Sequence, residues 1–200
     1  GRMADVEQRR GRPGYDRAGI LAVAVSTFIE HGYDATSIAM LADRLGLSKS
    51  AIYHHFASKE ALLAAALDAA LGGLEEAAAE SEALGGPAED RLAHVLRGAV
   101  HVLVDRLPEV TLLLRVRGNT DVERDALRRR RAFDRAMQAL VREAQDAGAV
   151  RPDVDARIVE RLLFGMVNSI VEWYRPGGPE DAGRLAEDVL AIALDGIRAR

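Results

Sequence analysis

The feature that most constrains this chain is a helical spacing of apolar residues, repeatedly interrupted by glycine and proline. Between Leu21 and Phe28, for example, apolar side chains return every three or four positions, which places them on one face of a helix. Alternation typical of strands is scarce. Hydrophobic residues make up 48% of the chain but aromatic residues only 4%, so a core must consist mainly of Ala, Leu and Val. Because Ala and Leu favour helices, we expect an all-α fold of about nine helices.

Glycine, proline and capping residues indicate where these helices begin and end. Gly32 and Gly46 end the first two helices, because glycine readily adopts the positive φ of a helix C-terminus. The expected helices cover about residues 16–31, 37–45, 48–54, 58 onward, 89–107, 108–117, 121–147, 153–174 and 180–198. The pair Gly72-Gly73 falls inside the fourth helix and is expected to bend or end it.

Charge is unevenly distributed along the chain. The net charge is −4, but residues 1–59 carry eight Lys or Arg against six Asp or Glu, whereas residues 60–200 carry nineteen against twenty-five. The only two lysines, Lys49 and Lys59, both lie in the first part. An acidic body with a locally basic end fits a specific DNA-binding protein better than a general nucleic-acid coat.

The N-terminal segment is rich in arginine and glycine and cannot build a core. It contains Arg9, Arg10 and Arg12, and we expect residues 1–15 to form a flexible basic arm. Two roles stay open for these arginines. They either enter a narrow, A·T-rich minor groove beside the main contact or remain solvated.

The short helix expected after Ser48 separates polar from mainly apolar residues. On a helical wheel one face holds Lys49, Ser50, Tyr53 and His54, and the other holds Ala51, Ile52, His55 and Phe56. A short turn containing Gly46 joins this helix to the preceding one, which is helix-turn-helix spacing. In that motif the second helix enters the major groove of DNA. Spacing alone leaves a short helix packed on a bundle as an equal alternative.

The residues themselves favour DNA binding. Gly32–Ile38, Leu41-Ala42 and Gly46–Glu60 resemble the signature of TetR-family transcriptional regulators, and the resemblance covers about residues 16–65. It implies a three-helix DNA-binding head over residues 16–60 and a helical bundle for ligand binding and dimerisation over residues 61–200. It also implies a repressor that binds a palindromic operator as a homodimer, formed by the last two helices, and leaves the DNA when a small-molecule inducer binds.

The resemblance assigns roles to individual residues of the head. Lys49 and Ser50 are placed for base edges, where a lysine can donate to guanine O6 and N7. The remaining contacts are expected to reach phosphate oxygens, whereas His55 is expected to pack inward. The full set of expected DNA-contacting residues is Thr36, Ser37, Ser48, Lys49, Ser50, Tyr53, His54 and Lys59.

The body is expected to hold the inducer between its helices. Residues 173–179, with the sequence WYRPGGP, resemble the C-terminal helix junction of actinobacterial TetR regulators of phenylacetate and steroid-ring breakdown, which respond to coenzyme A thioesters. A small apolar or aromatic effector is the alternative. The arginine run 128–131 either meets a ligand phosphate or is a solvated face, with Arg129 paired to Asp125. The expected ligand-binding residues are Leu114, Arg115, Arg117, Phe133, Met137, Phe164, Asn168, Trp173 and Arg175.

Other classes of protein find little support. The chain has no cysteine, which excludes disulfides and Cys-ligated zinc and favours a cytoplasmic setting. No apolar run is long enough to cross a membrane. The catalytic motifs of hydrolases, metalloproteases and phosphate-binding enzymes are missing, so we expect neither an enzyme nor a cofactor. His94 and His101 lie two helical turns apart, too far to share a metal ion. A purely structural helical adaptor would leave the Lys49–Lys59 cluster without a purpose.

Overall fold

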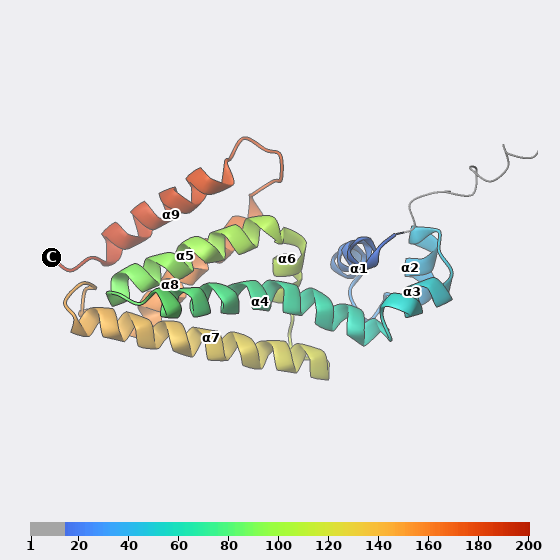
Figure 1. Ribbon diagram of the computed structural model, residues 1–200, viewed down its shortest axis with the longest axis horizontal. Helices are drawn as coiled ribbons and strands as arrows, with labels where there is room; N and C mark the ends of the chain where they lie inside the picture. The colour runs from blue at the N-terminus through green and yellow to red at the C-terminus, as the bar shows by residue number, and fades with distance from the viewer. Residues whose placement is uncertain (1–14) are drawn as a thin grey trace, which may run out of the picture. The chain divides into compact units, whose positions relative to one another are not determined.

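The computed structural model describes residues 15–200, and over these residues the expected all-α fold with nine α-helices is confirmed (Figure 1). The helices are α1 Arg17–His31, α2 Ile38–Leu45, α3 Lys49–His55, α4 Lys59–Leu84, α5 Ala88–Asp105, α6 Leu107–Arg115, α7 Asp121–Asp146, α8 Ala156–Ser169 and α9 Ala182–Ile197, with a short 3-10 helix η2 at Ile170–Glu172. The described residues form two compact units, residues 15–65 and 66–200. The expected basic arm, with Arg9, Arg10 and Arg12, lies outside the described residues.

The first unit packs α1, α2 and α3 around one apolar core. Its buried side chains include Ile20, Val25, Phe28, Leu41, Leu45, Ile52, Phe56, Leu62 and Leu63. Most of these are the apolar positions whose spacing predicted the helices. Packing among these buried side chains therefore fixes how α3 lies in this unit.

Serine side chains begin three of the helices in or after this unit. Ser37 Oγ accepts a hydrogen bond from the backbone N–H of Met40, and Ser48 Oγ accepts one from Ala51, each over 3.1 Å. Ser58 Oγ accepts from the N–H of Ala61 over 3.0 Å and so begins α4. Each bond satisfies an amide that the helix itself leaves unpaired. Between α2 and α3, Gly46 adopts a left-handed conformation with φ 64°, which allows the tight turn.

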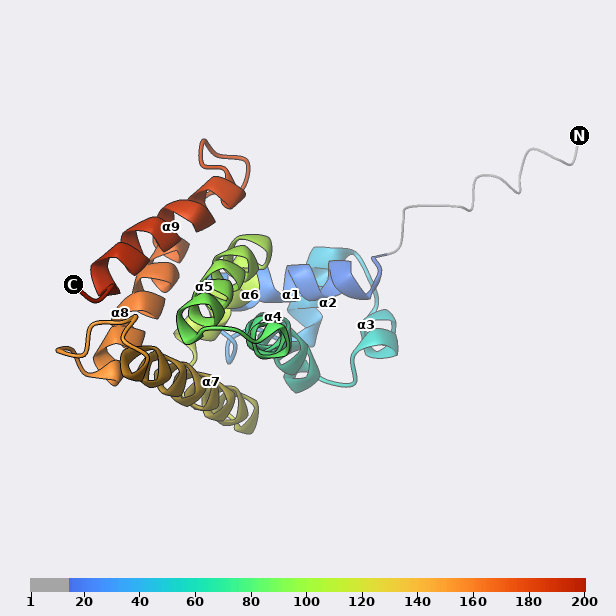
Figure 2. The same ribbon diagram turned by 60° about the vertical axis from the view of Figure 1, so that its left-hand side comes forward.

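The second unit is a bundle in which α5 contacts α6, α7, α8 and α9, while α7 also packs against α8 (Figures 1 and 2). The inner face of α5 buries Leu92, Val95, Leu96, Val100 and Leu103. At the end of the chain the N–H of Ala199 donates to the carbonyl of Ala149 over 3.1 Å, which attaches the segment after α9 to the α7–α8 connection. This hydrogen bond therefore fixes the C-terminal end of the bundle.

The structure corrects the expectation that Gly72-Gly73 ends the fourth helix, because α4 continues to Leu84. A Cβ on Gly73 would come within 2.9 Å of Val102 in α5, and a Cβ on Gly98 would come within 2.7 Å of Ala77 in α4. These two glycines let α4 and α5 approach closely. Their physical role is packing between helices rather than a break in one of them.

The helix expected over residues 153–174 is shorter in the structure. It begins after Asp155, whose carboxylate accepts from the N–H of Arg157 over 2.8 Å, and ends at Ser169. The 3-10 helix η2 then takes over, so Trp173 follows a tighter turn instead of continuing the α-helix. None of the described helices is long and apolar enough to span a membrane.

Candidate DNA-contacting helix and ligand cavity

The outer face of α3 carries a cluster of exposed polar side chains. Lys49, Ser50, Tyr53 and His54 are all exposed, and Tyr53 retains 48% of its accessible surface. The rings of His54 and His55 meet edge to face, with 5.2 Å between centroids, and His55 is half-buried. The arrangement offers an ammonium, hydroxyls and an imidazole on one short helix, which suits contacts to base edges and phosphates.

The inner face of α3 holds these groups in place. Ile52 has no exposed surface, and Phe56, directly after the helix, is 3% exposed. The guanidinium of Arg17 in α1 lies over the Phe56 ring, with 4.3 Å from Cζ to the ring centroid. Because the inner face of α3 is packed against the unit, its polar face is held in place and stays accessible from outside.

Two of the expected phosphate contacts have other bonds in this unit. Thr36 is 1% exposed, and its hydroxyl donates to the carbonyl of Gly32 over 2.7 Å, so the structure removes it from the DNA-contacting set. Ser37 next to it is exposed at the start of α2. The ammonium of Lys59 donates to the Tyr33 carbonyl over 2.9 Å and lies 4.1 Å from the centroid of its ring. Lys59 therefore supports the connection between α1 and α2 as well as carrying charge.

The second unit encloses a cavity of about 50 Å³ between α4, α5, α6, α7 and α8. Most of its wall is apolar. The lining residues are Leu71, Leu74, Ala99, Val102, Leu103, Val110, Leu113, Leu114, Arg130, Phe133, Asp134, Phe164, Val167 and Asn168. The space is large enough for a few water molecules, and a ligand of ordinary size requires the side chains around it to move apart.

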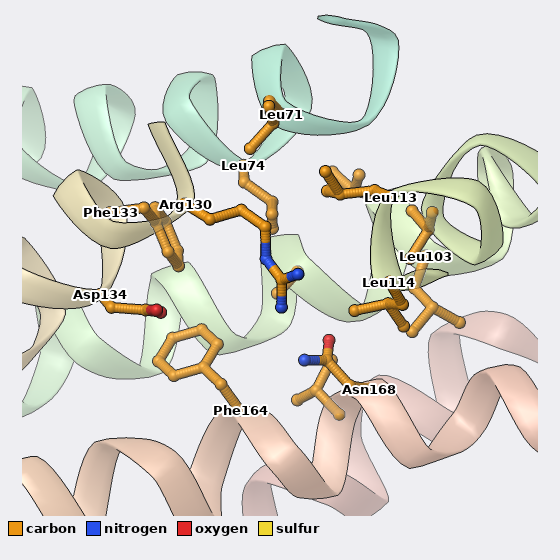
Figure 3. Close-up of a pocket in the computed structure, with 14 residues that line it drawn as sticks. Leu71, Leu74, Leu103, Leu113, Leu114, Arg130, Phe133, Asp134, Phe164 and Asn168 are labelled. Atoms are coloured by element: carbon orange, nitrogen blue, oxygen red, sulfur yellow. The ribbon is translucent and has the colours of Figure 1, made fainter. Parts of the chain in front are cut away.

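Three polar side chains interrupt this apolar wall. Figure 3 shows the guanidinium of Arg130 reaching into the middle of the cavity and pointing toward Asn168 of α8. Asp134, one turn after Arg130 on α7, lies near the rings of Phe133 and Phe164, which meet edge to face with 5.5 Å between centroids. A few polar groups on an otherwise apolar wall are typical of a small-molecule site.

Four of the nine expected ligand-binding residues line this cavity, namely Leu114, Phe133, Phe164 and Asn168. The other five, Arg115, Arg117, Met137, Trp173 and Arg175, do not. Met137 is buried elsewhere, Trp173 is 48% exposed after η2, and the three arginines are exposed. Trp173 lies away from the cavity because α8 ends at Ser169 and the 3-10 helix η2 follows it.

Three arginines of the run on α7 have different surroundings. Arg128 pairs with Asp125 over 3.1 Å, and Arg129 pairs with Asp68 and Glu75 of α4, which corrects the expected Arg129–Asp125 pair. Arg130 points into the cavity. Reasoning from sequence did not separate Arg130 from its neighbours, although its spacing from Phe133 and Asp134 places all three toward one side of a helix.

Asp134 forms a hydrogen bond with a buried carboxyl group, that of Glu160. Glu160 of α8 is 2% exposed, and the amide of Gln138 donates to its Oε2 over 3.4 Å. Burial, together with the hydrogen bond and charge of Asp134, raises the pKa of Glu160 to about 7. Glu160 therefore keeps its proton up to near neutral pH and can donate it in a hydrogen bond to Asp134.

Apolar side chains are exposed on α8 and α9. Leu162 and Ile192 are 66% and 67% exposed, and Ile158 and Met166 lie one turn from Leu162 on the same helix. A Cβ on Gly165 would meet nothing within 4 Å. Ile170 in η2 and Val189 on α9 are instead buried within the chain.

A helix-turn-helix head followed by a helical bundle with an internal cavity defines the class of DNA-binding transcriptional regulators. Two family models match the chain, "Bacterial regulatory proteins, tetR family" at residues 20–66 and "Tetracyclin repressor-like, C-terminal domain" at residues 85–197. The chain belongs to the TetR family, as its sequence signature indicated.

Relatives of known structure agree with this assignment. SCO3833 of Streptomyces coelicolor A3, a member of the TetR transcriptional regulator family, is 50% identical, with 90% of each chain covered and a TM-score of 0.81. The ketosteroid transcriptional regulator KstR2 of Mycobacterium tuberculosis is 26% identical, with 95% of this chain and 98% of KstR2 covered and a TM-score of 0.83. AibR, crystallised with isovaleryl coenzyme A and operator DNA, shares the fold at 24% identity, 88% and 96% coverage and a TM-score of 0.71.

Proposed function

We propose that this chain is a cytoplasmic repressor that binds a palindromic operator as a homodimer and is released by a small-molecule inducer. The observation that carries the proposal is the exposed polar face of α3, held by a buried face that includes Ile52. KstR2 is named a transcriptional repressor, and 29% of its residues are identical to this chain over 189 aligned residues. Repression by operator binding is the function that best accounts for the polar face of α3 and for the similarity to KstR2.

On DNA, α3 would enter the major groove with its N-terminal residues toward the bases. Lys49 and Ser50 would read base edges, and Ser37, Tyr53 and His54 would reach phosphate oxygens. All five side chains are exposed. Ser48 uses its Oγ as the N-cap of α3, and its O–H proton stays available to a phosphate.

The dimer would form through the exposed apolar residues of α8 and α9. Leu162, Met166 and Ile192 supply the apolar surface, and Gly165 allows close approach of two helices. A two-fold dimer buries the same patch on both subunits and presents two recognition helices to half-sites about one turn, or about 34–36 Å, apart.

The inducer would bind the cavity of the second unit. An acyl coenzyme A thioester, or a related aromatic or carboxylated catabolite, fits the apolar wall with its few polar groups. Support for a thioester comes from the fold, since AibR was crystallised with isovaleryl coenzyme A, and from the similarity to a ketosteroid regulator. Because the cavity is only about 50 Å³, ligand entry has to open it.

Opening the cavity gives the ligand a route to α4, which supplies Leu71 and Leu74 to the wall and begins at Lys59 in the head. A ligand that binds better to the opened form shifts the population away from the closed one. To change the ratio of opened to closed protein from 1:99 to 99:1, the ligand must bind the opened form about 5.5 kcal/mol more favourably than the closed form.

A gel-shift assay on DNA from the protein's own promoter region tests the proposal. We expect a discrete complex that survives competition by unrelated DNA and whose affinity falls as salt is raised, because phosphate contacts release counterions. Titrating the preformed complex with phenylacetyl coenzyme A, other acyl thioesters and the free acids then tests release. Binding that is equal on all sequences would contradict an operator-specific repressor.

A further inference from the structure

Arg130 differs from the arginines beside it in the sequence. Arg128 and Arg129 both form ion pairs, with Asp125 and with Asp68 and Glu75. Over the part of the chain that the structure describes, Arg130 has no carboxylate partner, and its guanidinium lies inside the cavity among apolar side chains (Figure 3). A charged group in such surroundings loses hydration without gaining a counter-charge.

Asp134 could be expected to neutralise Arg130, because it lies one turn further along α7. It instead hydrogen-bonds to Glu160 of α8, which is 2% exposed. Among the described residues no ion pair joins Asp134 to Arg130, so the guanidinium in the cavity has no carboxylate in direct contact with it.

We propose that the cavity binds a small monocarboxylate, whose carboxylate is held by Arg130 and Asn168 and whose apolar part packs on Phe133 and Phe164. The proposal rests on the ligand-responsive function proposed above and narrows its ligand class from thioesters and related catabolites to free carboxylic acids. The fork of the guanidinium matches a carboxylate with two parallel N–H···O bonds, and the amide of Asn168 adds a third donor.

The size and wall of the cavity favour a free acid over a thioester. About 50 Å³ suits a compact group once the leucines and phenylalanines move slightly, whereas pantetheine and a nucleotide would have to stay outside. A thioester carbonyl is also neutral, so it would leave Arg130 without an ion pair. A carboxylate forms that ion pair in surroundings of low dielectric, where the attraction is strengthened.

Calorimetric titration of the full-length protein without DNA tests this inference. The probes are phenylacetate and isovalerate, each compared with its neutral amide and its coenzyme A thioester. We expect each carboxylate to bind at least tenfold more tightly than its amide. Arg130→Gln should weaken carboxylate binding at least tenfold and leave amide binding unchanged, whereas Arg131→Gln, at the exposed next position, should change neither.

Equal binding of acid and amide would overturn the proposal, as would binding of the thioesters alone or no binding of either acid. An equal loss in Arg130→Gln and Arg131→Gln would show a general charge effect and also overturn it. The comparison of acid with amide on the unmodified protein stands even if Arg130→Gln does not fold. Gel shifts without ligand report the repressor function separately, so carboxylate binding by a protein that ignores DNA would refute only that function.

Discussion

Arg129 of α7 donates a hydrogen bond from Nη1 to Oδ1 of Asp68 in α4 over 3.0 Å, while its Nη2 binds Glu75 two turns further along α4. The hydrogen bond to Glu75 and the charges of both carboxylates raise the pKa of Arg129. Between these two acids, α4 places Leu71 and Leu74 on the cavity wall. One side chain thus joins two helices that both line the cavity.

Replacing Arg129 by alanine should lower the free energy of unfolding by about 1 kcal/mol, because two partly exposed ion pairs and their hydrogen bonds are lost together. Chemical denaturation followed by circular dichroism measures this, and the loss should shrink at high salt. Arg128→Ala is the matched control, since the Arg128–Asp125 pair is exposed on a single helix and should contribute close to nothing. Equal losses in the two variants would contradict a special role for Arg129.

Gly98→Ala should destabilise the bundle by about 1–3 kcal/mol, because the new methyl group would meet the Cβ of Ala77 at 2.7 Å and push α4 and α5 apart. Gly72→Ala in α4 is the control. Its Cβ would meet nothing within 4 Å, so the change should stabilise the helix by up to about 1 kcal/mol. Thermal unfolding of both variants compares them directly, and stabilisation by Gly98→Ala would refute the packing argument.

Local signals in the sequence predicted the start and end of helices well. Ser37, Ser48 and Gly46 act within four residues of themselves, so their roles can be read from short segments. The partner of Arg129 was predicted wrongly for the opposite reason. Asp68 is 61 residues away and reaches Arg129 only through the packing of α4 on α7, whereas helical spacing offered Asp125 as a neighbour.

The same distinction explains the candidate sites. The polar face of α3 is a property of one helix, and the residues predicted on it, Lys49, Ser50, Tyr53 and His54, are all exposed. The two predicted contacts that are not exposed, Thr36 and Lys59, lie outside α3. The cavity is formed by five helices, and which arginine faces it depends on how α7 is rotated against α4 and α8. Periodicity gives the faces of a helix but not the neighbours that those faces meet. Arg130 was therefore not singled out, and Trp173, which was expected to line the cavity, lies outside it.

Lys49→Ala and Tyr53→Phe should affect DNA binding differently. Loss of Lys49 should relax the preference for one base by about 1–3 kcal/mol, because a donor to a base edge is removed. Tyr53→Phe should weaken binding to all sequences alike without changing the salt slope, since a neutral hydroxyl releases no counterion. Binding to an operator and to single-base variants at several salt concentrations separates these outcomes. Uniform weakening by Lys49→Ala would contradict its assignment to a base.

Leu162→Asp should convert the proposed dimer to a monomer, because a carboxylate on a desolvated apolar interface lacks a partner. Sedimentation or light scattering at micromolar concentration measures the mass. Leu84→Asp is a control of the same chemistry, since Leu84 is 72% exposed at the end of α4 and outside the proposed interface. A monomeric unmodified protein, or equal effects of the two changes, would contradict an interface on α8 and α9.

The buried carboxyl pair predicts a pH dependence of stability. Because burial and Asp134 raise the pKa of Glu160 from 4.5 to about 7, the folded protein holds a proton that the unfolded chain releases. The free energy of unfolding contributed by this group should therefore fall as pH rises from about 4.5 to 7 and level off above. The difference in pKa sets an upper bound of about 3 kcal/mol on that loss.

Glu160→Gln should remove this part of the pH dependence, because glutamine keeps the shape of the side chain and can donate to Asp134 but carries no titrating proton. The variant should be more stable than the unmodified protein at pH 8, where the buried charge is present, and nearly equal to it at pH 5. Urea denaturation at both values measures the difference, with exposed Glu172→Gln as the control. If the two proteins differ by the same amount at pH 5 and pH 8, Glu160 does not titrate with a raised pKa.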